Sequence, residues 1–365
     1  MRRREAAFTL VELMIAMAIV MVVLYAAINF FIVSVRQYKV QTKIVETNVE
    51  GILGLELFRQ DLESLGFGLP WNNLVSYTER TGVDALIMAL NDSPNAPRAV
   101  LSVNNPAFTH NTSDYLVIKS ARVGMSDAAG KWTTLTQGNI KRIWTPGGEN
   151  LDNTDYVIVL AVGNTDANRR SLVTSGTFYT QFNDTDAFVP VEPYSANIVY
   201  GIDGGQPVRP FNRAEYYIDN SPVTLPQRCA PNTGVLVKAV VAHNGNGTTP
   251  TPLPLLDCVA DMQVVYVLDT DTNPSTAPIP SDDISVGMTA ADIRAQLVEV
   301  RVYILGQEGQ RDDSYTYKNV LDNTHANEIL VGPDTVHGRY IDLSGYRNYR
   351  WKVYSIVVKP KNLAQ

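Results

Sequence analysis

The segment from Phe8 to Val35 constrains this chain most, because its 28 residues carry a single charge, that of Glu12. About 20 apolar residues are enough for a helix to span a bilayer. The segment therefore predicts a membrane-spanning helix. A carboxylate within such a helix costs roughly 2.5–3.5 kcal/mol on insertion scales, so Glu12 indicates a functional role with a charged partner.

Two simpler explanations of this segment are a secretory signal peptide and an ordinary membrane anchor. A signal peptide has a basic start, like Arg2–Arg4 here, and a small-residue cleavage site after its apolar core, like Ala26-Ala27. Its core is usually about 7–15 residues, which is shorter than this segment, and neither explanation gives Glu12 a purpose. Long polar domains translocate largely regardless of flanking charge, so we expect the rest of the chain to lie outside the cytoplasm.

A short basic leader, from Arg2 to Ala7, precedes the run Phe8-Thr-Leu-Val-Glu-Leu-Met-Ile-Ala16. This arrangement resembles the class III signal of type IV prepilins, which the pseudopilins of type II secretion share. The resemblance implies cleavage by prepilin peptidase between Ala7 and Phe8, followed by N-methylation of Phe8. It also implies that Glu12 forms a salt bridge with the N-terminal ammonium of a neighbouring subunit. The family usually has Gly before the cut, and because Ala7 is also small we expect processing, at a lower rate.

The helix is predicted to continue beyond the membrane. Apolar residues recur at spacings of three and four, which indicates one face of an amphipathic helix that packs on the rest of the protein: Val45, Val49, Ile52, Leu53, Leu57, Phe58, Leu62 and Leu65. Gly66, Gly68 and Pro70 are expected to end it. Gly51 and Gly54 lie inside this stretch and are either a flexible point or sites of close packing against a sheet.

After residue 70 the pattern becomes that of β-strands, rich in Val, Ile and Tyr and bounded by Gly, Pro, Asn and Asp. The predicted strands are Tyr115–Ser120, Tyr156–Val162, Asn197–Ile202, Ala214–Ile218, Val235–Ala242, Met262–Leu268, Val298–Leu305 and Trp351–Val358. The stretches Asn244–Pro254 and Thr270–Asp283 are predicted loops.

We therefore predict an α+β, pilin-like fold, in which a long N-terminal helix packs on an antiparallel sheet with an enlarged β-rich distal region. The chain divides into a leader (1–7), a transmembrane or filament-core helix (8–35), an amphipathic continuation (36–66) and a globular domain (67–365). That domain is either one large β-domain or a pilin core with an inserted subdomain.

The distal region carries a second, looser resemblance. Several segments follow one another in this order: the runs Gly234-Val-Leu-Val-Lys-Ala-Val-Val241 and Pro254-Leu-Leu-Asp-Cys-Val-Ala-Asp-Met-Gln-Val-Val-Tyr266, a short helix near Ala290–Ala295, the strand Leu297-Val-Glu-Val-Arg-Val-Tyr-Ile-Leu305 and a last strand near the C-terminus. This order resembles the minor pilins of the PilW group. The pseudopilin at the J position of type II secretion is a more distant and usually shorter relative.

The charge balance is acidic, with 30 basic and 37 acidic residues, and removal of the leader would change the net charge from −7 to −9. This argues against stable, broad binding of nucleic acid, which needs a basic surface. It leaves open a local basic patch, whose candidate residues are Arg347, Arg350, Lys352, Lys359 and Lys361.

Cys229 and Cys258 are the two cysteines of the chain. In an envelope-exposed domain two cysteines most often pair, so we expect a disulfide, with two buried free thiols as the alternative. The oxygen-bearing residues Asp269, Asp271 and Asn273 open like a calcium loop. Pro274 then replaces the turn glycine and Pro280 the closing Glu, so a solvated turn is the better interpretation. No metal and no cofactor is predicted.

Sequence motifs of enzymes are missing. The stretch from Gly124 to Lys131 has five residues between its glycines, where a phosphate-binding loop has four, and Trp132 stands where Ser or Thr would hold magnesium. It is predicted to be a turn between two strands. We expect a protein that is not an enzyme.

The two resemblances together imply a minor type IV pilin, a structural subunit that helps to initiate pilus assembly at or near the tip and contributes to adhesion or DNA uptake. Its expected partners are prepilin peptidase, other minor and major pilins, the inner-membrane assembly platform and, before assembly, membrane lipid. The globular domain would lie in the periplasm before assembly and outside the cell afterwards. The alternatives are a type II secretion pseudopilin and a tip adhesin or other ligand-binding pilin.

The predicted processing can be tested by mass spectrometry of the protein extracted from membranes. The expected species is a 358-residue chain that begins with methylated Phe8. An N-terminus near Ala27 or Ile28 would instead identify a conventional signal peptide and contradict the prepilin interpretation.

Overall fold

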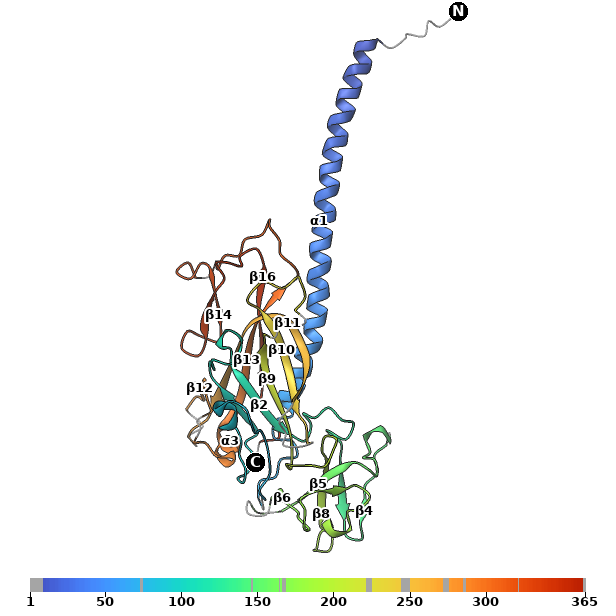
Figure 1. Cartoon of the computed structure of the whole chain (residues 1–365), viewed down its shortest axis with the longest axis vertical. Helices are drawn as coiled ribbons and strands as arrows, with labels where there is room; N and C mark the ends of the chain where they lie inside the picture. Colours follow the sequence, from blue (N-terminus) through green and yellow to red (C-terminus); the bar gives the residue numbers. More distant parts are fainter. Residues whose placement is uncertain are drawn as a thin grey trace, which may run out of the picture.

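The computed structural model describes residues 9–72, 75–145, 147–163, 165, 169–220, 225–243, 250–271, 276–284, 287–320 and 322–363. Its dominant feature is the helix α1 (Leu10–Glu63), which projects from the β-rich part of the molecule (Figure 1). At 1.5 Å per residue its 54 residues span about 81 Å. Ser64 caps its end, and Gly66 and Gly68 turn the chain away with positive φ angles.

The N-terminal half of α1 has no protein around it. In the described part of the chain, α1 is the one helix that is long and apolar enough to cross a membrane, and none of its most apolar stretch is buried. Large apolar side chains point outwards from Leu10 to Val33, each more than half exposed. This half of α1 therefore needs lipid or other proteins as its surroundings.

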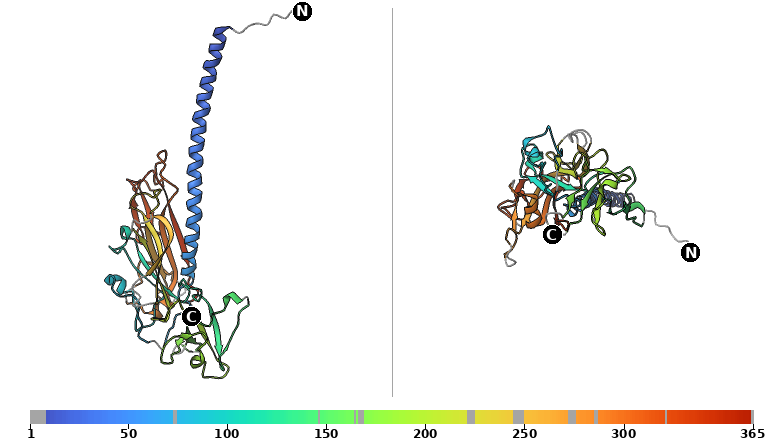
Figure 2. Two further views of the ribbon diagram at one scale, coloured as in Figure 1. Left: turned by 45° about the vertical axis from the view of Figure 1, so that its right-hand side comes forward. Right: turned by 90° about the horizontal axis from the view of Figure 1, so that it is seen from below.

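The other half of α1 packs on a large antiparallel sheet, which confirms the predicted α+β architecture (Figures 1 and 2). The sheet has eight strands within the described residues, and short β12 (Ile279–Ser281) pairs only with β11. The remaining seven lie in the order β1 (Val100–Val103), β2 (Tyr115–Ser120), β9 (Asn212–Asp219), β10 (Gly234–Val241), β11 (Pro250–Leu268), β13 (Leu297–Glu308) and β16 (Arg350–Val358).

A second antiparallel sheet is formed by the segment between β2 and β9. Six of its strands are described: β3 (Trp132–Thr136), β4 (Ile140–Lys141), β5 (Tyr156–Ala161), β6 (Ser171–Leu172), β7 (Thr180–Gln181) and β8 (Ala196–Gly201). It lies at the end of the molecule opposite the projecting part of α1 (Figure 2). Leu135, Val157, Val159 and Val199 form part of its own core.

Smaller elements complete the described structure. The hairpin β14 (Glu328–Val331) and β15 (Arg339–Asp342) lies between β13 and β16 in the chain. Two short α-helices and three 3₁₀ turns connect the strands: α2 (Ala85–Met88), α3 (Ala290–Gln296), η1 (His110–Thr112), η2 (Gly147–Glu149) and η3 (Asp186–Phe188).

The predicted strands all correspond to observed ones, with shifts of up to three residues at their ends except for Met262–Leu268, since β11 begins much earlier, at Pro250. One loop prediction is wrong, because Pro250–Pro254 begins β11; residues 244–249 lie outside the described residues. Within the predicted loop Thr270–Asp283, β12 is a short strand and residues 272–275 are not among those described. The stretch from Gly124 to Lys131 is a connection between β2 and β3, as predicted.

The face of α1 that meets the sheet differs from the prediction at its N-terminal end. Leu55, Phe58 and Leu62 are buried, and the Phe58 ring stacks on Tyr216 with centroids 4.5 Å apart. By contrast, five residues predicted to face the core are 48–67% exposed: Val45, Val49, Ile52, Leu53 and Leu57.

Two glycines explain why the face of α1 that meets the sheet differs from the predicted apolar face. A Cβ at Gly54 would lie 1.7 Å from the carbonyl oxygen of Leu255, and one at Gly51 would lie 3.0 Å from Leu256 Cδ1. The backbone of α1 therefore approaches β11 along its glycine face, and the neighbouring apolar residues turn outwards. Gly51 and Gly54 are close-packing sites, the second of the two predicted roles.

A polar contact fixes the same end of the helix. The buried carboxylate of Asp61 accepts hydrogen bonds from Tyr216 Oη at 2.7 Å and Lys238 Nζ at 2.8 Å. Burial raises the pKa of Asp61, and the nearby Lys238 ammonium opposes that shift. These two partners satisfy a charge that would otherwise oppose docking of the helix on the sheet.

The expected disulfide between Cys229 and Cys258 is present, with Cα atoms 5.0 Å apart. It joins the loop before β10 to β11, close to α1. The Gln307 side chain holds the same loop, accepting from the amide of Ala230 at 2.6 Å and donating to the carbonyl of Arg228 at 2.8 Å.

Substitution of Gly54 by alanine tests the close approach of α1 and β11. We expect Gly54→Ala to lower the free energy of unfolding by about 3 kcal/mol, because the added methyl group would overlap Leu255 and overpacking typically costs about 1–3 kcal/mol. Urea unfolding followed by tryptophan fluorescence measures this. Gly204→Ala is the control, since no atom lies near its Cβ; equal stability of the two variants would contradict the packing.

Reduction of the disulfide should destabilise the globular domain. A bond that closes a separation of 29 residues contributes about 3–4 kcal/mol in the chain-entropy model. Peptide mapping without reductant should recover Cys229 and Cys258 in one species, and unfolding with and without reductant gives the energy. Alkylation of both thiols in the unreduced protein would rule the bond out.

Candidate functional site

The described N-terminal end of α1 is a capping box built from Thr9 and Glu12. The Glu12 Oε2 atom accepts hydrogen bonds from the Thr9 amide and the Thr9 hydroxyl, both at 2.9 Å. The Thr9 hydroxyl oxygen accepts in turn from the Glu12 amide at 3.3 Å. Thr-x-x-Glu is a known start signal for helices, so Thr9 could have been identified from the sequence.

This geometry directs the Glu12 carboxylate towards the N-terminal end of the helix. Ala7 and Phe8, the residues of the expected cleavage and methylation, lie outside the described residues. Phe8 directly precedes Thr9 in the chain, so an ammonium created there would start one residue from the capping box. A carboxylate has about four lone-pair positions, which leaves acceptor capacity beyond the two bonds from Thr9.

The apolar surface of α1 extends beyond the part that could lie in a membrane. After a more polar stretch that includes Arg36, Lys39 and Lys43, exposed apolar side chains recur on α1 at Val45, Val49, Ile52 and Leu53. Such a second exposed apolar patch marks a region that contacts lipid or protein.

The calcium candidates do not form a site in the described structure. The amide of Asp269 donates to the carbonyl of Gln296 at 2.7 Å, just after β11, and Asp271 lies in a bend. Asn273 lies outside the described residues. Among the residues that are described, no group of three or more His, Cys, Asp or Glu side chains is placed to hold a metal ion.

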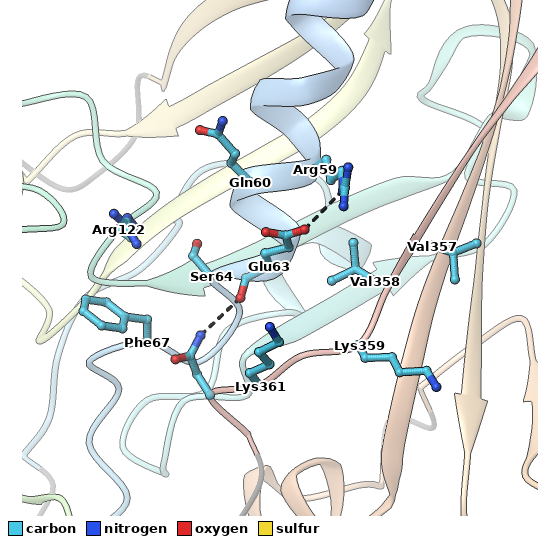
Figure 3. A pocket seen from close by; sticks show the side chains of 11 residues that line it. Arg59, Gln60, Glu63, Ser64, Phe67, Arg122, Val357, Val358, Lys359 and Lys361 are labelled. Carbon is cyan, nitrogen blue, oxygen red and sulfur yellow. Dashed lines mark hydrogen bonds and ion pairs between the residues drawn. The ribbon is translucent and has the colours of Figure 1, made fainter.

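The basic residues noted in the sequence are divided between two places. Lys359 and Lys361 line a hollow of about 540 Å³ at the end of α1, together with Arg59, Arg122 and residues of β16 (Figure 3). Arg350 and Lys352 lie elsewhere, paired with Asp312 and Glu308 at 3.1 Å each. The single basic patch considered from the sequence is therefore not formed.

Residues that line the hollow contact the C-terminal end of α1. Arg59 pairs with Glu63 at 3.1 Å, and the side-chain amide of Asn362 donates to the backbone carbonyl of Glu63 at 3.1 Å. In Figure 3 Lys361 points towards this end of α1, whereas Lys359 points away from it. Cations near the last carbonyls of a helix are stabilising, because those carbonyls carry partial negative charge.

Comparison with known proteins agrees with the geometry of the N-terminus. Residues 2–28 match the family model described as the prokaryotic N-terminal methylation motif. The match includes Ala7, Phe8 and the Thr9–Glu12 capping box.

Neither the curated proteins nor the solved structures contain a match to the chain. The N-terminal motif implies processing by prepilin peptidase and assembly with other pilins, and the exposed apolar helix is consistent with membrane anchoring before assembly. The chain is a type IV prepilin-like protein.

Proposed function

We propose that this chain is a minor type IV pilin of the PilW group, a non-enzymatic subunit that helps to start pilus assembly at or near the tip. The observation that carries the proposal is the Glu12 carboxylate at the start of a long, exposed, apolar helix. The leader is removed by prepilin peptidase and Phe8 is methylated. The globular domain lies in the periplasm until the assembly platform of the inner membrane incorporates the subunit into an extracellular pilus.

The surroundings of α1 change during this process. In the membrane, lipid covers the apolar side chains from Leu10 to Val33, and Glu12 lies near the interface, where water is close. In a filament, the apolar helices of neighbouring subunits replace the lipid, and the exposed side chains Val45, Val49, Ile52 and Leu53 extend the surface available for that packing.

The filament core would make an unpaired carboxylate far more costly than it is at the membrane surface. The ammonium at Phe8 of a neighbouring subunit supplies the counter-charge, and methylation leaves that ammonium cationic. Glu12 would then exchange or share its bonds to Thr9 with the incoming ammonium. The capping box thus keeps the carboxylate directed to the helix end, ready for this partner.

The second sheet favours a place near the tip and a role in ligand binding, such as adhesion. It lies far from the projecting part of α1 (Figure 1), and Ile140, Ile143, Val191 and Tyr194 expose apolar surface there. A large exposed domain is accommodated more easily at a filament end than along its length. DNA uptake is a weaker variant of this role, because the chain is acidic.

A pseudopilin of type II secretion has the same N-terminal chemistry and is the alternative. The size of the region beyond α1 favours the pilus. Neighbouring genes for other minor prepilins would support the pilus, and a secretion operon would support the alternative.

Substitution of Glu12 tests the assembly role. Glu12→Val makes the helix more apolar, so membrane insertion and leader cleavage should persist. Incorporation into pili should fall at least about tenfold, because a lost charge–charge contact in an apolar core is worth more than about 1.4 kcal/mol. The measurement is the amount of this protein in sheared pili relative to membranes, with pili counted in parallel.

Glu56→Ala provides the matched control, since it removes an exposed carboxylate of the same helix that pairs only weakly with Arg59, at 3.8 Å. It should leave incorporation unchanged. Normal incorporation and normal piliation with Glu12→Val would reduce the assignment to a membrane-anchored envelope protein.

A further inference from the structure

The loop that follows β13 lies beside α1 at the point where the apolar segment ends. The amide of Gly309 donates to Thr47 Oγ1 at 3.0 Å, and Gly309 packs on Ile44. Further along the loop, Gln310 lines a hollow of about 360 Å³ together with α1 residues Phe31, Ile32, Val35, Arg36, Lys39 and Val40. In Figure 1 this part of the chain rises alongside α1 towards its projecting half.

A second loop holds the first in place. The amide of Asp312 donates to the Asn348 carbonyl at 2.8 Å, and the amide of Tyr317 donates to the Arg347 carbonyl at 2.7 Å. Arg350 pairs with Asp312 at 3.1 Å and lies over the Tyr315 ring at 4.2 Å. The two loops therefore form one fixed surface at the membrane-proximal end of the globular domain.

This surface carries available positive charge. Arg36 and Lys39 have no ion-pair partner among the described residues, and Arg311 pairs only with Asp313, whose side chain is 82% exposed. An exposed pair of this kind is weak and leaves Arg311 able to contact another anion. The Asp312 carboxylate already pairs with Arg350 and accepts a hydrogen bond from the backbone amide of Ser314. Tyr38 is 70% exposed on the same part of α1.

Cations and tyrosines at the end of an apolar helix match the chemistry of a membrane surface. Arg and Lys reach phosphate groups at that depth, and tyrosine favours the headgroup region. An anionic surface attracts basic segments within about 10 Å.

We propose that this juxtamembrane surface, formed by Arg36, Lys39, Arg311 and Tyr315, binds the headgroups of anionic phospholipids before assembly. The contact rests on the membrane anchoring of the proposed function. It holds the globular domain against the bilayer, and it must break when the subunit leaves the membrane for a filament.

The test uses the full-length chain in vesicles of phosphatidylcholine alone or of an equal mixture with phosphatidylglycerol. The native cysteines are joined, so Gln310→Cys introduces one reactive thiol for a fluorophore. We expect quenching of this probe by acrylamide, an uncharged water-soluble quencher, to be at least twofold weaker in the mixed vesicles. A probe at Gly204→Cys, in the connection between β8 and β9, should be quenched equally in both.

Two triple variants separate this surface from general charge. Combining Arg36→Gln, Lys39→Gln and Arg311→Gln should abolish the lipid dependence. Combining Arg122→Gln, Lys359→Gln and Lys361→Gln removes the same charge at the far end of α1 and should preserve it. Equal quenching at position 310 in both vesicles, or an equal effect of the two triple variants, would overturn the proposal.

Flotation of the vesicles distinguishes this failure from failure of the proposed function. Protein that floats with both vesicles but shows equal quenching refutes the lipid contact alone. Protein that floats with neither refutes the anchoring on which both proposals depend.

Discussion

The close contact between the glycine face of α1 and β11 determines how the rest of the molecule is presented. Because Gly54 has no side chain, the helix backbone reaches the carbonyl of Leu255, and Phe58 and Leu62 then fill the space above the sheet. The same rotation turns Val45, Val49 and Ile52 outwards. One contact thus produces both the docking of the globular domain and a second exposed apolar patch on α1, separated from the membrane segment by a polar stretch.

The carboxylates near the two ends of α1 are held in different ways. At the buried end, Asp61 is matched within the chain by Lys238 and Tyr216. At the N-terminal end, Glu12 is held, among the described residues, by the capping box of Thr9. The first arrangement is complete in a single subunit, whereas the proposed function requires that the second gain a cation from another subunit in an apolar filament core. On that proposal, one helix is stable in a monomer and still favours assembly.

The sequence predicted the elements whose pattern is long enough to carry a period. Tyr115–Ser120 appears with the same bounds, and the long helix and the Cys229–Cys258 bond are present. Two-residue strands such as β6 have no detectable alternation, so most of the second sheet was not predicted. The helix face was misassigned because glycine contributes no hydrophobic signal, although its small size decides the packing. The Thr9–Glu12 capping box was readable from its spacing. The partner of Glu12 in another subunit is not specified by the periodicity of one chain and rests on the resemblance to prepilins.

The central claim is that the outward apolar face of α1 is covered by other pilin subunits in the filament. Site-specific photocrosslinking in assembled pili tests it most directly, with a photoreactive residue at Ile52, on the exposed face, and at Gly204, in the connection between β8 and β9. We predict that position 52 gives adducts to other pilins in sheared pili and that position 204 gives none to their helices. Incorporation of the protein into pili without any adduct from position 52 would contradict the account.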